Sequence, residues 1–286
     1  TLGILIPPSI TMILYGIASE TSIGRLFIAG IIPGLLLTLL FMAWALFLSW
    51  KRGTKLVDSD RIYTMKEKLE LMPRLLPFIA VIIGVVYALY GGIATPSEAA
   101  GVGAMLCLVM VVVIYRVWRP MDLWAILRDG LRESGMLLMI IGTSILFGYM
   151  MSSLQVTQAV AQTIAELQVN RWVVLAAINL LLLVAGCFLP PAAIILMTTP
   201  ILMPVITAAG FDPIWFGVIL TINMELGLIT PPVGLNLFVI NGITPDVRLT
   251  TILKGAFPFM CCMVLAILIL CVFPELATWL PQKMMG

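Results

Sequence analysis

Stretches of about 20 consecutive, mostly apolar residues recur along the sequence, and they restrict the chain to very few kinds of fold. Such a stretch is long enough to cross the hydrocarbon core of a bilayer as an α-helix. Hydrophobic residues make up 62% of the chain and charged residues only 10%, whereas soluble domains carry about 25% charged residues. The sequence therefore predicts an all-α polytopic membrane protein. The predicted spans are 26–50, 75–93, 101–118, 135–151, 173–189 and 251–274.

Composition disfavours several other classes of protein. The formal net charge is +2 and the charges fall between the apolar spans, so nothing indicates nucleic-acid binding. The five cysteines form no CxxC pair and histidine is absent, which argues against disulfides and metal sites. A membrane enzyme is disfavoured because the sequence lacks paired intramembrane carboxylates and the HExxH and GxSxG motifs. Because the sequence begins with Thr1, we expect its natural N-terminus to lie upstream.

Lysine and arginine cluster in two places, and these clusters orient the chain. Seven of the sixteen lie in 51–74, and the next four lie in 116–132. Two spans separate the clusters, so both lie on one side of the membrane, which the positive-inside rule makes cytoplasmic. The loops 94–101 and 152–171 then face outward. We interpret 51–74 as a connector on the membrane surface.

Two apolar segments are interrupted by adjacent prolines in the same pattern. They are "LGILIPPSITMILYGI" (2–17) and "LGLITPPVGLNLFVI" (226–240), which align without a gap around the prolines. The similarity continues downstream after a shift of one residue, so we interpret the two segments as an internal repeat. The aligned pairs are Gly3 with Gly227, Ile6 with Thr230, Pro7-Pro8 with Pro231-Pro232, Gly30 with Gly255 and Pro33 with Pro258.

The predicted topology gives the two copies opposite directions across the membrane. The helix after the first copy ends in the cytoplasmic cluster, so the loop 18–24 faces outward. If 173–207 is a hairpin broken at "GCFLPPAA", the segment 214–243 crosses inward and the loop 244–248 is cytoplasmic. Inverted repeats with Gly/Pro-interrupted helices at mid-bilayer are typical of secondary transporters.

The Pro-Pro segments also supply oxygen atoms that could bind a cation. A proline removes one backbone donor and displaces the carbonyl four residues earlier from its helical bond, so Pro7 frees the Gly3 carbonyl and Pro231 frees that of Gly227. Inside a bilayer an unwound backbone is tolerated only where it lines a protein cavity or a site. Thr230 and Ser9 add hydroxyls, and the alternative is a simple helix kink.

Several motifs resemble the large membrane subunit (DctM-type, M subunit) of tripartite ATP-independent periplasmic (TRAP) transporters, which belongs to the wider ion transporter superfamily. They are "GILIPPSITMILYGI", "ATPSEAAGVGA", "GCFLPPAAIILMTTPILMPV" and "DPIWFGVILTINMELGLITPPVGLNLFVINGI". The resemblance covers essentially the whole chain. It departs from the family in two places, because a first hairpin with a serine-rich tip is not in this sequence and Pro190-Pro191 replaces an acidic residue found at the tip of the second.

The resemblance implies an elevator-type, sodium-coupled symporter that imports an organic acid anion of the C4-dicarboxylate or sialic acid type. It further implies a small (Q or DctQ-type) membrane subunit, a periplasmic substrate-binding protein, and a multi-pass location in the bacterial inner membrane. Sodium is the expected coupling ion, with no organic cofactor. The alternatives are a sodium/carboxylate symporter of the same superfamily that needs no binding protein, and, less in keeping with broken inverted repeats, a channel.

The resemblance also implies two sodium sites, each formed where a hairpin tip meets a broken helix. One would use the backbone around Gly3, Ile6 and Pro8. The other would use Gly186 with Gly227, Thr230, Pro232 and Val233. Polar residues within apolar segments are candidates for the substrate or its pathway, although such groups also serve as helix-packing contacts or bond their own backbone. These are Ser9, Glu225, Asn236, Thr198 and Thr199.

We accordingly expect a division into moving and static parts. The transport core would combine the first broken helix (1–25) with the second repeat (135–250), which contains the hairpin 173–207 and the broken helix 214–243. The scaffold would consist of helices and cytoplasmic interfacial loops in 26–134 and a C-terminal helix in 251–286.

Overall fold

The computed structural model describes residues 2–52, 65–91, 93–156, 158–159, 162, 169–244 and 247–285. These residues are helical and contain no strand, which confirms the predicted all-α class. The helices are η1 (Leu2–Ile4), α1 (Ile10–Ala18), α2 (Ile23–Arg52), α3 (Met65–Tyr90), α4 (Pro96–Val113), α5 (Pro120–Ser153), α7 (Arg171–Gly186), α8 (Pro191–Ala208), α9 (Pro213–Leu228), α10 (Leu235–Ile243), α11 (Leu249–Val272) and α12 (Glu275–Met285).

The chain divides into two compact units. The first comprises residues 1–47 and 137–286, and the second comprises 48–136. The predicted boundary between 134 and 135 falls inside α5, which contributes residues to both units. The helices α2, α11 and α12 pack in the same unit as the predicted transport core. Compactness does not distinguish moving from static parts, so the predicted functional division stays a prediction.

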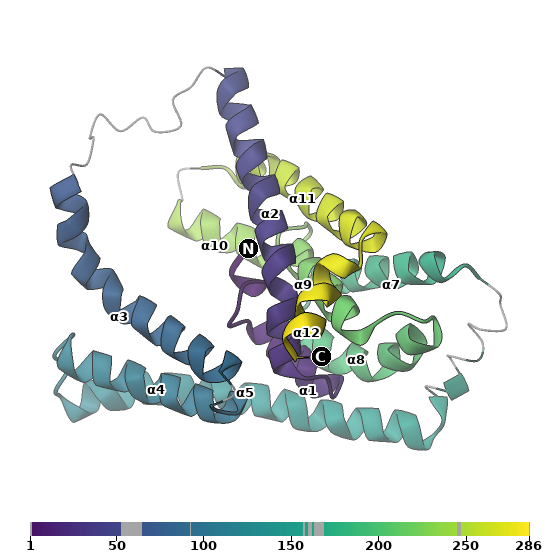
Figure 1. The fold of residues 1–286 in the computed structure, drawn as a ribbon, viewed down its shortest axis with the longest axis horizontal. Coiled ribbons are helices and arrows are strands. Elements are labelled where there is room, and N and C mark those ends of the chain that lie inside the picture. The colour runs from purple at the N-terminus through teal and green to yellow at the C-terminus, as the bar shows by residue number, and fades with distance from the viewer. Residues whose placement is uncertain are drawn as a thin grey trace. The chain divides into compact units, whose positions relative to one another are not determined.

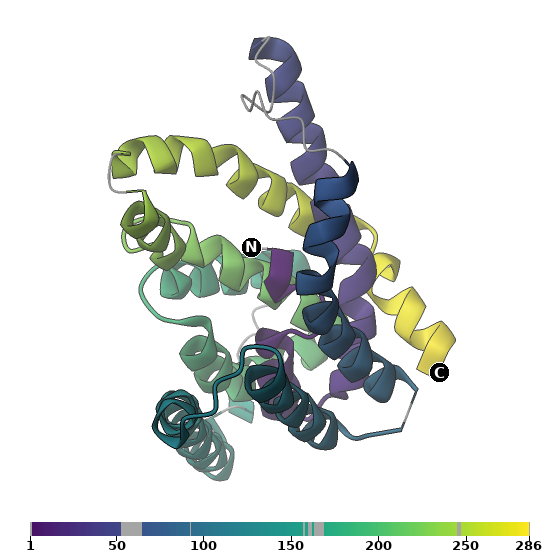
Figure 2. The ribbon, with the colours of Figure 1, turned by 90° about the vertical axis from the view of Figure 1, so that its left-hand side faces the viewer.

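Helix α9 forms the centre of the first unit. Every residue from Trp215 to Leu228 is buried, as expected for a helix that is apolar on all sides. It packs against α1, α7, α8, α10, α11 and α12 (Figure 1 and Figure 2). Two hydrogen bonds anchor its first turns, because the Trp215 indole donates to the Leu270 carbonyl at 2.8 Å and the Tyr15 hydroxyl donates to the Pro213 carbonyl at 2.7 Å.

Local sequence explains where the helices of this unit begin and end. The segment predicted as a hairpin contains α7 and α8, joined by residues 187–190, and Pro191 occupies the first position of α8, where its missing N–H is not needed. Asp212 caps α9 by accepting hydrogen bonds from the N–H groups of Ile214 and Trp215 at 2.7 and 3.1 Å. The C-terminal segment, predicted as one helix, is two helices, because Pro274 cannot continue the hydrogen-bond ladder of α11.

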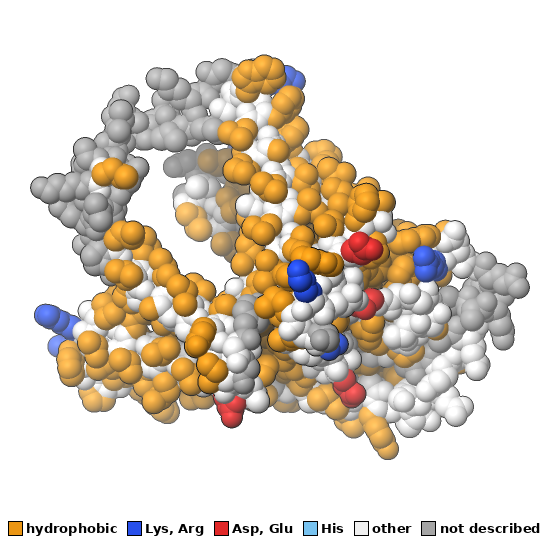
Figure 3. All heavy atoms as spheres, in the orientation of Figure 1, with side chains coloured by type: hydrophobic (Ala, Val, Ile, Leu, Met, Phe, Trp, Pro, Cys, Tyr) orange, Lys and Arg blue, Asp and Glu red, His pale blue; other side chains and the backbone are white. Residues whose placement is uncertain are grey.

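Many helices present apolar side chains outward. In Figure 3, hydrophobic side chains cover most of the visible surface of α2 and α11. Such a surface is stable against lipid rather than water. Among the described helices, five are long and apolar enough to cross a membrane, which supports the predicted multi-pass membrane protein. They are Ile23–Lys51, Pro96–Val113, Pro120–Ser153, Pro191–Ala208 and Leu249–Val272.

The second unit contains the helical pair α3 and α4. A capping box starts α4, since the Thr95 hydroxyl accepts from the Glu98 N–H at 3.4 Å and the Glu98 carboxylate accepts from the Thr95 N–H at 2.7 Å. The helix α3 begins at Met65, so the end of the predicted surface connector 51–74 is helical. Residues 53–64 of that connector lie outside the described residues.

Candidate functional site

The ends of α7 and α9 meet at two glycines. Gly186 is the last residue of α7, and Gly227 lies one residue before the end of α9. A Cβ atom on Gly227 would lie 2.7 Å from the Cα of Gly186, 2.8 Å from its carbonyl carbon and 3.1 Å from its carbonyl oxygen. The two backbones are therefore in direct contact, a closeness that small residues permit between membrane helices. The end of the first hairpin helix thus touches the broken helix just before its break.

Thr230 lies directly after this contact, in the break. Its hydroxyl donates to the Leu226 carbonyl at 2.6 Å, and its N–H donates to the Gly227 carbonyl at 3.1 Å. The expectation that Pro231 leaves the Gly227 carbonyl free is thus wrong, because a tightened last turn supplies a donor. The carbonyl keeps a second lone pair, and the threonine hydroxyl, which donates its proton, keeps both of its lone pairs. The Gly186 backbone therefore lies against Gly227, three residues before Thr230, and backbone and hydroxyl oxygens of this kind can bind an alkali cation.

The chain re-enters a helix through Gly234. This residue has φ of +54°, a left-handed conformation that glycine adopts without cost. A Cβ there would also lie 2.9 Å from the Leu237 side chain and 3.2 Å from the Thr230 carbonyl oxygen. Pro232 is exposed and Val233 is half-buried, and their part in a cation site stays a prediction. The Pro231–Pro232 peptide bond is cis, as is the Pro7–Pro8 bond of the first break.

The first break, between η1 and α1, has a different hydrogen-bond arrangement. The Ser9 hydroxyl donates to the Ile4 carbonyl, which also accepts from the Thr11 hydroxyl at 3.3 Å. Ser9 is buried and caps α1 by accepting from the Met12 N–H at 3.3 Å. The carbonyl that attracts hydroxyls is therefore that of Ile4, not that of Gly3. The other predicted ligands of this site, Gly3, Ile6 and Pro8, are exposed in this structure.

The two breaks lie close together within the first unit. Helix α9 contacts η1, and Leu2 and Ile229 line one cavity of about 480 Å³. Its remaining walls are apolar side chains and Gly255 from α2, α10 and α11. The first break also packs on α2, where a Cβ on Gly30 would lie 2.6 Å from the Leu5 carbonyl oxygen. The structure thus brings the predicted sites of both copies to neighbouring positions.

Helix α9 carries two buried polar side chains that join it to other helices. The Asn223 amide nitrogen donates to the Asn179 backbone carbonyl at 2.9 Å and to its side-chain oxygen at 2.7 Å, which connects α9 to α7. Glu225 is only 2% exposed, and its Oε1 accepts from the Asn236 amide at 3.0 Å, which connects α9 to α10. The predicted pathway residues Glu225 and Asn236 therefore bind each other.

The two threonines predicted on the second hairpin helix have different environments. The Thr198 hydroxyl donates to the Ile194 carbonyl at 2.7 Å, which is a bond to its own helix. Thr199 is completely buried, and its hydroxyl has no hydrogen-bond partner among the described residues. Among the described residues no hydrogen bond joins either threonine to a break, and their predicted role in substrate binding stays a prediction.

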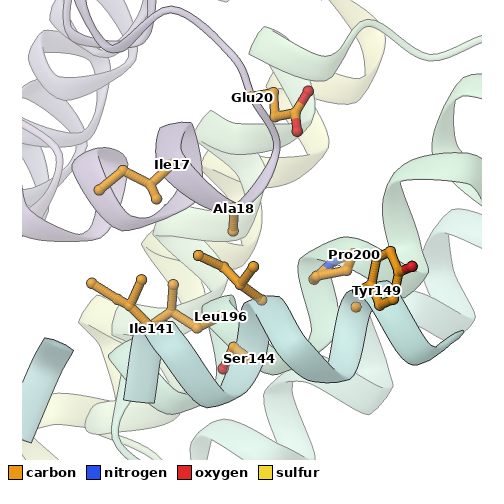
Figure 4. Close-up of a pocket in the computed structure, with 10 residues that line it drawn as sticks. Ile17, Ala18, Glu20, Ile141, Ser144, Tyr149, Leu196 and Pro200 are labelled. Carbon is orange, nitrogen blue, oxygen red and sulfur yellow. The ribbon is translucent and has the colours of Figure 1, made fainter. Parts of the chain in front are cut away.

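A second cavity, of about 350 Å³, lies between the end of α1, α5 and α8 (Figure 4). Its polar groups include the Glu20 carboxylate, the Tyr149 hydroxyl and the buried Ser144. It contains no lysine or arginine among its lining residues, and a carboxylate repels an anionic ligand. The Glu20 carboxylate therefore disfavours an organic anion in this cavity.

A profile of the family described as "Tripartite ATP-independent periplasmic transporter, DctM component" matches residues 1–276. The chain belongs to the DctM family. This confirms the resemblance seen in the motifs. Members of the DctM family are transporter components and not enzymes. This confirms the expectation from the sequence that the chain is not a membrane enzyme.

Relatives of this DctM-family chain are named for different substrates. It is 38% identical over 282 residues to the C4-dicarboxylate TRAP transporter large permease protein DctM of Pseudomonas aeruginosa, covering 99% of this chain and 65% of that protein. It is 33% identical over 287 residues to the sialic acid TRAP transporter large permease protein SiaM of Vibrio cholerae, covering 100% and 66%. It is 33% identical over 275 residues to the isethionate TRAP transporter permease protein DctMQ of Oleidesulfovibrio alaskensis, covering 96% and 43%. The chain spans about two thirds of the length of the first two relatives.

Two residues at the centre of this DctM-family unit were not predicted from the sequence. Asn179 pairs with Asn223, and Tyr15 joins α1 to the start of α9. Asn179 could have been found as a polar residue inside an apolar span, where side chains commonly bond across helices. Nothing in the sequence around Tyr15 distinguishes it from other aromatic residues in apolar segments.

Proposed function

We propose that this chain is the membrane permease component of a sodium-coupled TRAP symporter. The observation that supports the proposal is the contact between Gly186 and Gly227, which joins the hairpin to the broken helix three residues before Thr230. Sodium bound there would hold the end of α7 against the break. Substrate and sodium would favour the same closed arrangement, and this shared preference is the coupling.

The proposed substrate is an organic acid anion of the C4-dicarboxylate or sialic acid type, in keeping with the names of two relatives. Helix α8 begins at the hairpin turn and helix α10 begins at the break. Neither has a side-chain cap at its N-terminus. The N-terminus of a helix carries partial positive charge and unpaired N–H groups, which favour a carboxylate.

The proposed partners are a small membrane subunit and a periplasmic substrate-binding protein, with the complex in the bacterial inner membrane. The name DctMQ of one relative supports the small subunit, and the family description supports the periplasmic component. We further propose that the two Pro-Pro segments are inverted repeats and that the transport core moves against a static scaffold as an elevator. The alternative is a sodium/carboxylate symporter that needs no binding protein.

Counterflow in proteoliposomes tests this proposal. The intact transporter would be reconstituted with and without its binding protein, and exchange of labelled organic acid would be followed in sodium and in choline. We expect exchange that requires both sodium and the binding protein. Exchange without sodium contradicts the proposed coupling, and full exchange without the binding protein favours the alternative symporter.

Replacing Thr230 with alanine should weaken sodium binding more than substrate binding. The variant loses one hydroxyl oxygen beside Gly227, and we expect the sodium concentration for half-maximal uptake to rise about tenfold, which corresponds to about 1.4 kcal/mol. The matched control is Thr207→Ala, because the Thr207 hydroxyl also bonds the carbonyl four residues earlier in its own helix, at 2.8 Å, away from the break. An unchanged sodium dependence in Thr230→Ala would count against the site.

A further inference from the structure

The carboxyl group of Glu225 is buried beside the break. Glu225 lies three residues before the end of α9 and is only 2% exposed, and its sequence neighbours Met224 and Leu226 are buried apolar residues. An ionisable side chain in such a place is costly to bury, and it is most readily explained by a specific partner and a function. One partner among the described residues is Asn236, whose amide nitrogen donates to the Glu225 Oε1 at 3.0 Å.

This hydrogen bond spans the break. Glu225 belongs to the last turn of α9, whereas Asn236 is the second residue of α10. The backbone hydrogen bonds before the break stay with α9, since the Thr230 N–H donates to the Gly227 carbonyl. Those after the break stay with α10, since the Leu237 N–H donates to the Gly234 carbonyl. The prolines between the halves are exposed. The side-chain bond therefore holds together two half-helices whose backbone ladders are not continuous with each other.

We propose that Glu225 and Asn236 form a polar clamp that fixes the spacing of the two half-helices and thereby positions the oxygens of Gly227 and Thr230 for the cation. This inference rests on the proposed sodium-coupled function. Both are positioning residues. Their side chains bond each other through Glu225 Oε1, and they act on the cation site only through the helix ends that this bond holds. The clamp requires an acceptor at position 225 and a donor at position 236, and it does not require a negative charge.

Sodium titrations of uptake in the intact transporter test the clamp. We expect Glu225→Leu and Asn236→Leu each to raise the sodium concentration for half-maximal uptake about tenfold. The double variant should raise it no further than either single variant, because the two residues act through one bond. Substrate KM at saturating sodium should change by less than about twofold.

Glu225→Gln separates the clamp from a direct effect of charge. Glutamine keeps an oxygen acceptor of the same reach, so we expect its sodium dependence to stay within about twofold of the wild type. The matched control is Thr221→Val on the same helix, because among the described residues the buried Thr221 hydroxyl bonds only the Gly217 carbonyl of its own helix, at 2.8 Å. It should leave the sodium dependence unchanged.

Each outcome decides a different statement. Uptake by the wild type without sodium would overturn the proposed function itself. If wild-type uptake depends on sodium but Glu225→Leu has the wild-type sodium concentration for half-maximal uptake, the clamp is overturned. It is also overturned if Glu225→Gln raises that concentration as much as Glu225→Leu does. If the leucine variants fail to insert, the double variant E225N/N236Q decides. It shortens the side chain at 225 and lengthens the one at 236, and it keeps an acceptor and a donor. Half-saturation within about threefold of the wild type supports the clamp, and a tenfold loss contradicts it.

Discussion

Replacing Gly227 with alanine is expected to reduce sodium-coupled uptake by more than about tenfold, because the added methyl group cannot fit. Its Cβ would lie 2.7 Å from the Gly186 Cα and 2.8 Å from the Gly186 carbonyl carbon, both of which are backbone atoms without rotational freedom. Overpacking at such a contact costs about 1–3 kcal/mol. The helices must separate, and the Gly186 backbone then moves away from Gly227. Uptake by the reconstituted variant measures the effect.

The reciprocal substitution and a neighbouring glycine provide the comparison. A Cβ on Gly186 would lie 3.2 Å from the Gly227 Cα, so Gly186→Ala should be impaired less than Gly227→Ala. Gly242 on α10 has no atom within 4 Å of such a Cβ, and Gly242→Ala should transport normally. Full uptake by Gly227→Ala would show that the contact between the two glycines is dispensable.

The substitution P231A/P232A should abolish coupled uptake while leaving the protein inserted in the membrane. Two alanines have high helix propensity and restore the missing N–H donors, so α9 and α10 can join into one helix. A continuous helix would return the carbonyls near the break to helical hydrogen bonds and remove the uncapped N-terminus of α10. Uptake measured alongside membrane insertion distinguishes loss of function from loss of folding.

Pro258→Ala is the control for this substitution. Pro258 lies inside the continuous helix α11 rather than at a break. Its replacement should preserve uptake, since no site depends on an interruption there. Normal uptake by the Pro231-Pro232 variant would contradict the role given to the unwound segment.

Much of the fold could be predicted because a few local features dominate it. Apolar stretches of sufficient length specify membrane helices, and some prolines mark where helices stop, whereas Pro33 and Pro258 lie inside helices. The separation of α9 from α10 follows from Pro231-Pro232, and the start of α8 follows from Pro191. The division of the C-terminal segment at Pro274 was missed, although the same rule applies to it.

The site could be predicted only as a set of residues. That Gly186 touches Gly227 depends on how two helices cross, which spacing along the sequence does not encode. The proline rule singled out the Gly3 carbonyl, and it could not show that the Ser9 and Thr11 hydroxyls bond the Ile4 carbonyl, because that depends on the geometry of the turn. Likewise Glu225 was recognised as unusual, while its bond to Asn236 required the geometry of α10 beside α9.

Thermal unfolding of the intact purified transporter in sodium and in choline tests the cation site most directly, because it requires neither substrate nor transport. A ligand that binds the folded state raises its stability by about 2.7 kcal/mol at a hundred times its Kd. Sodium should therefore raise the Tm of the wild type above its value in an equal concentration of choline, and it should raise that of the P231A/P232A variant much less. Equal Tm values for the wild type in the two salts, or an equal sodium effect in the variant, would contradict a sodium site at the break.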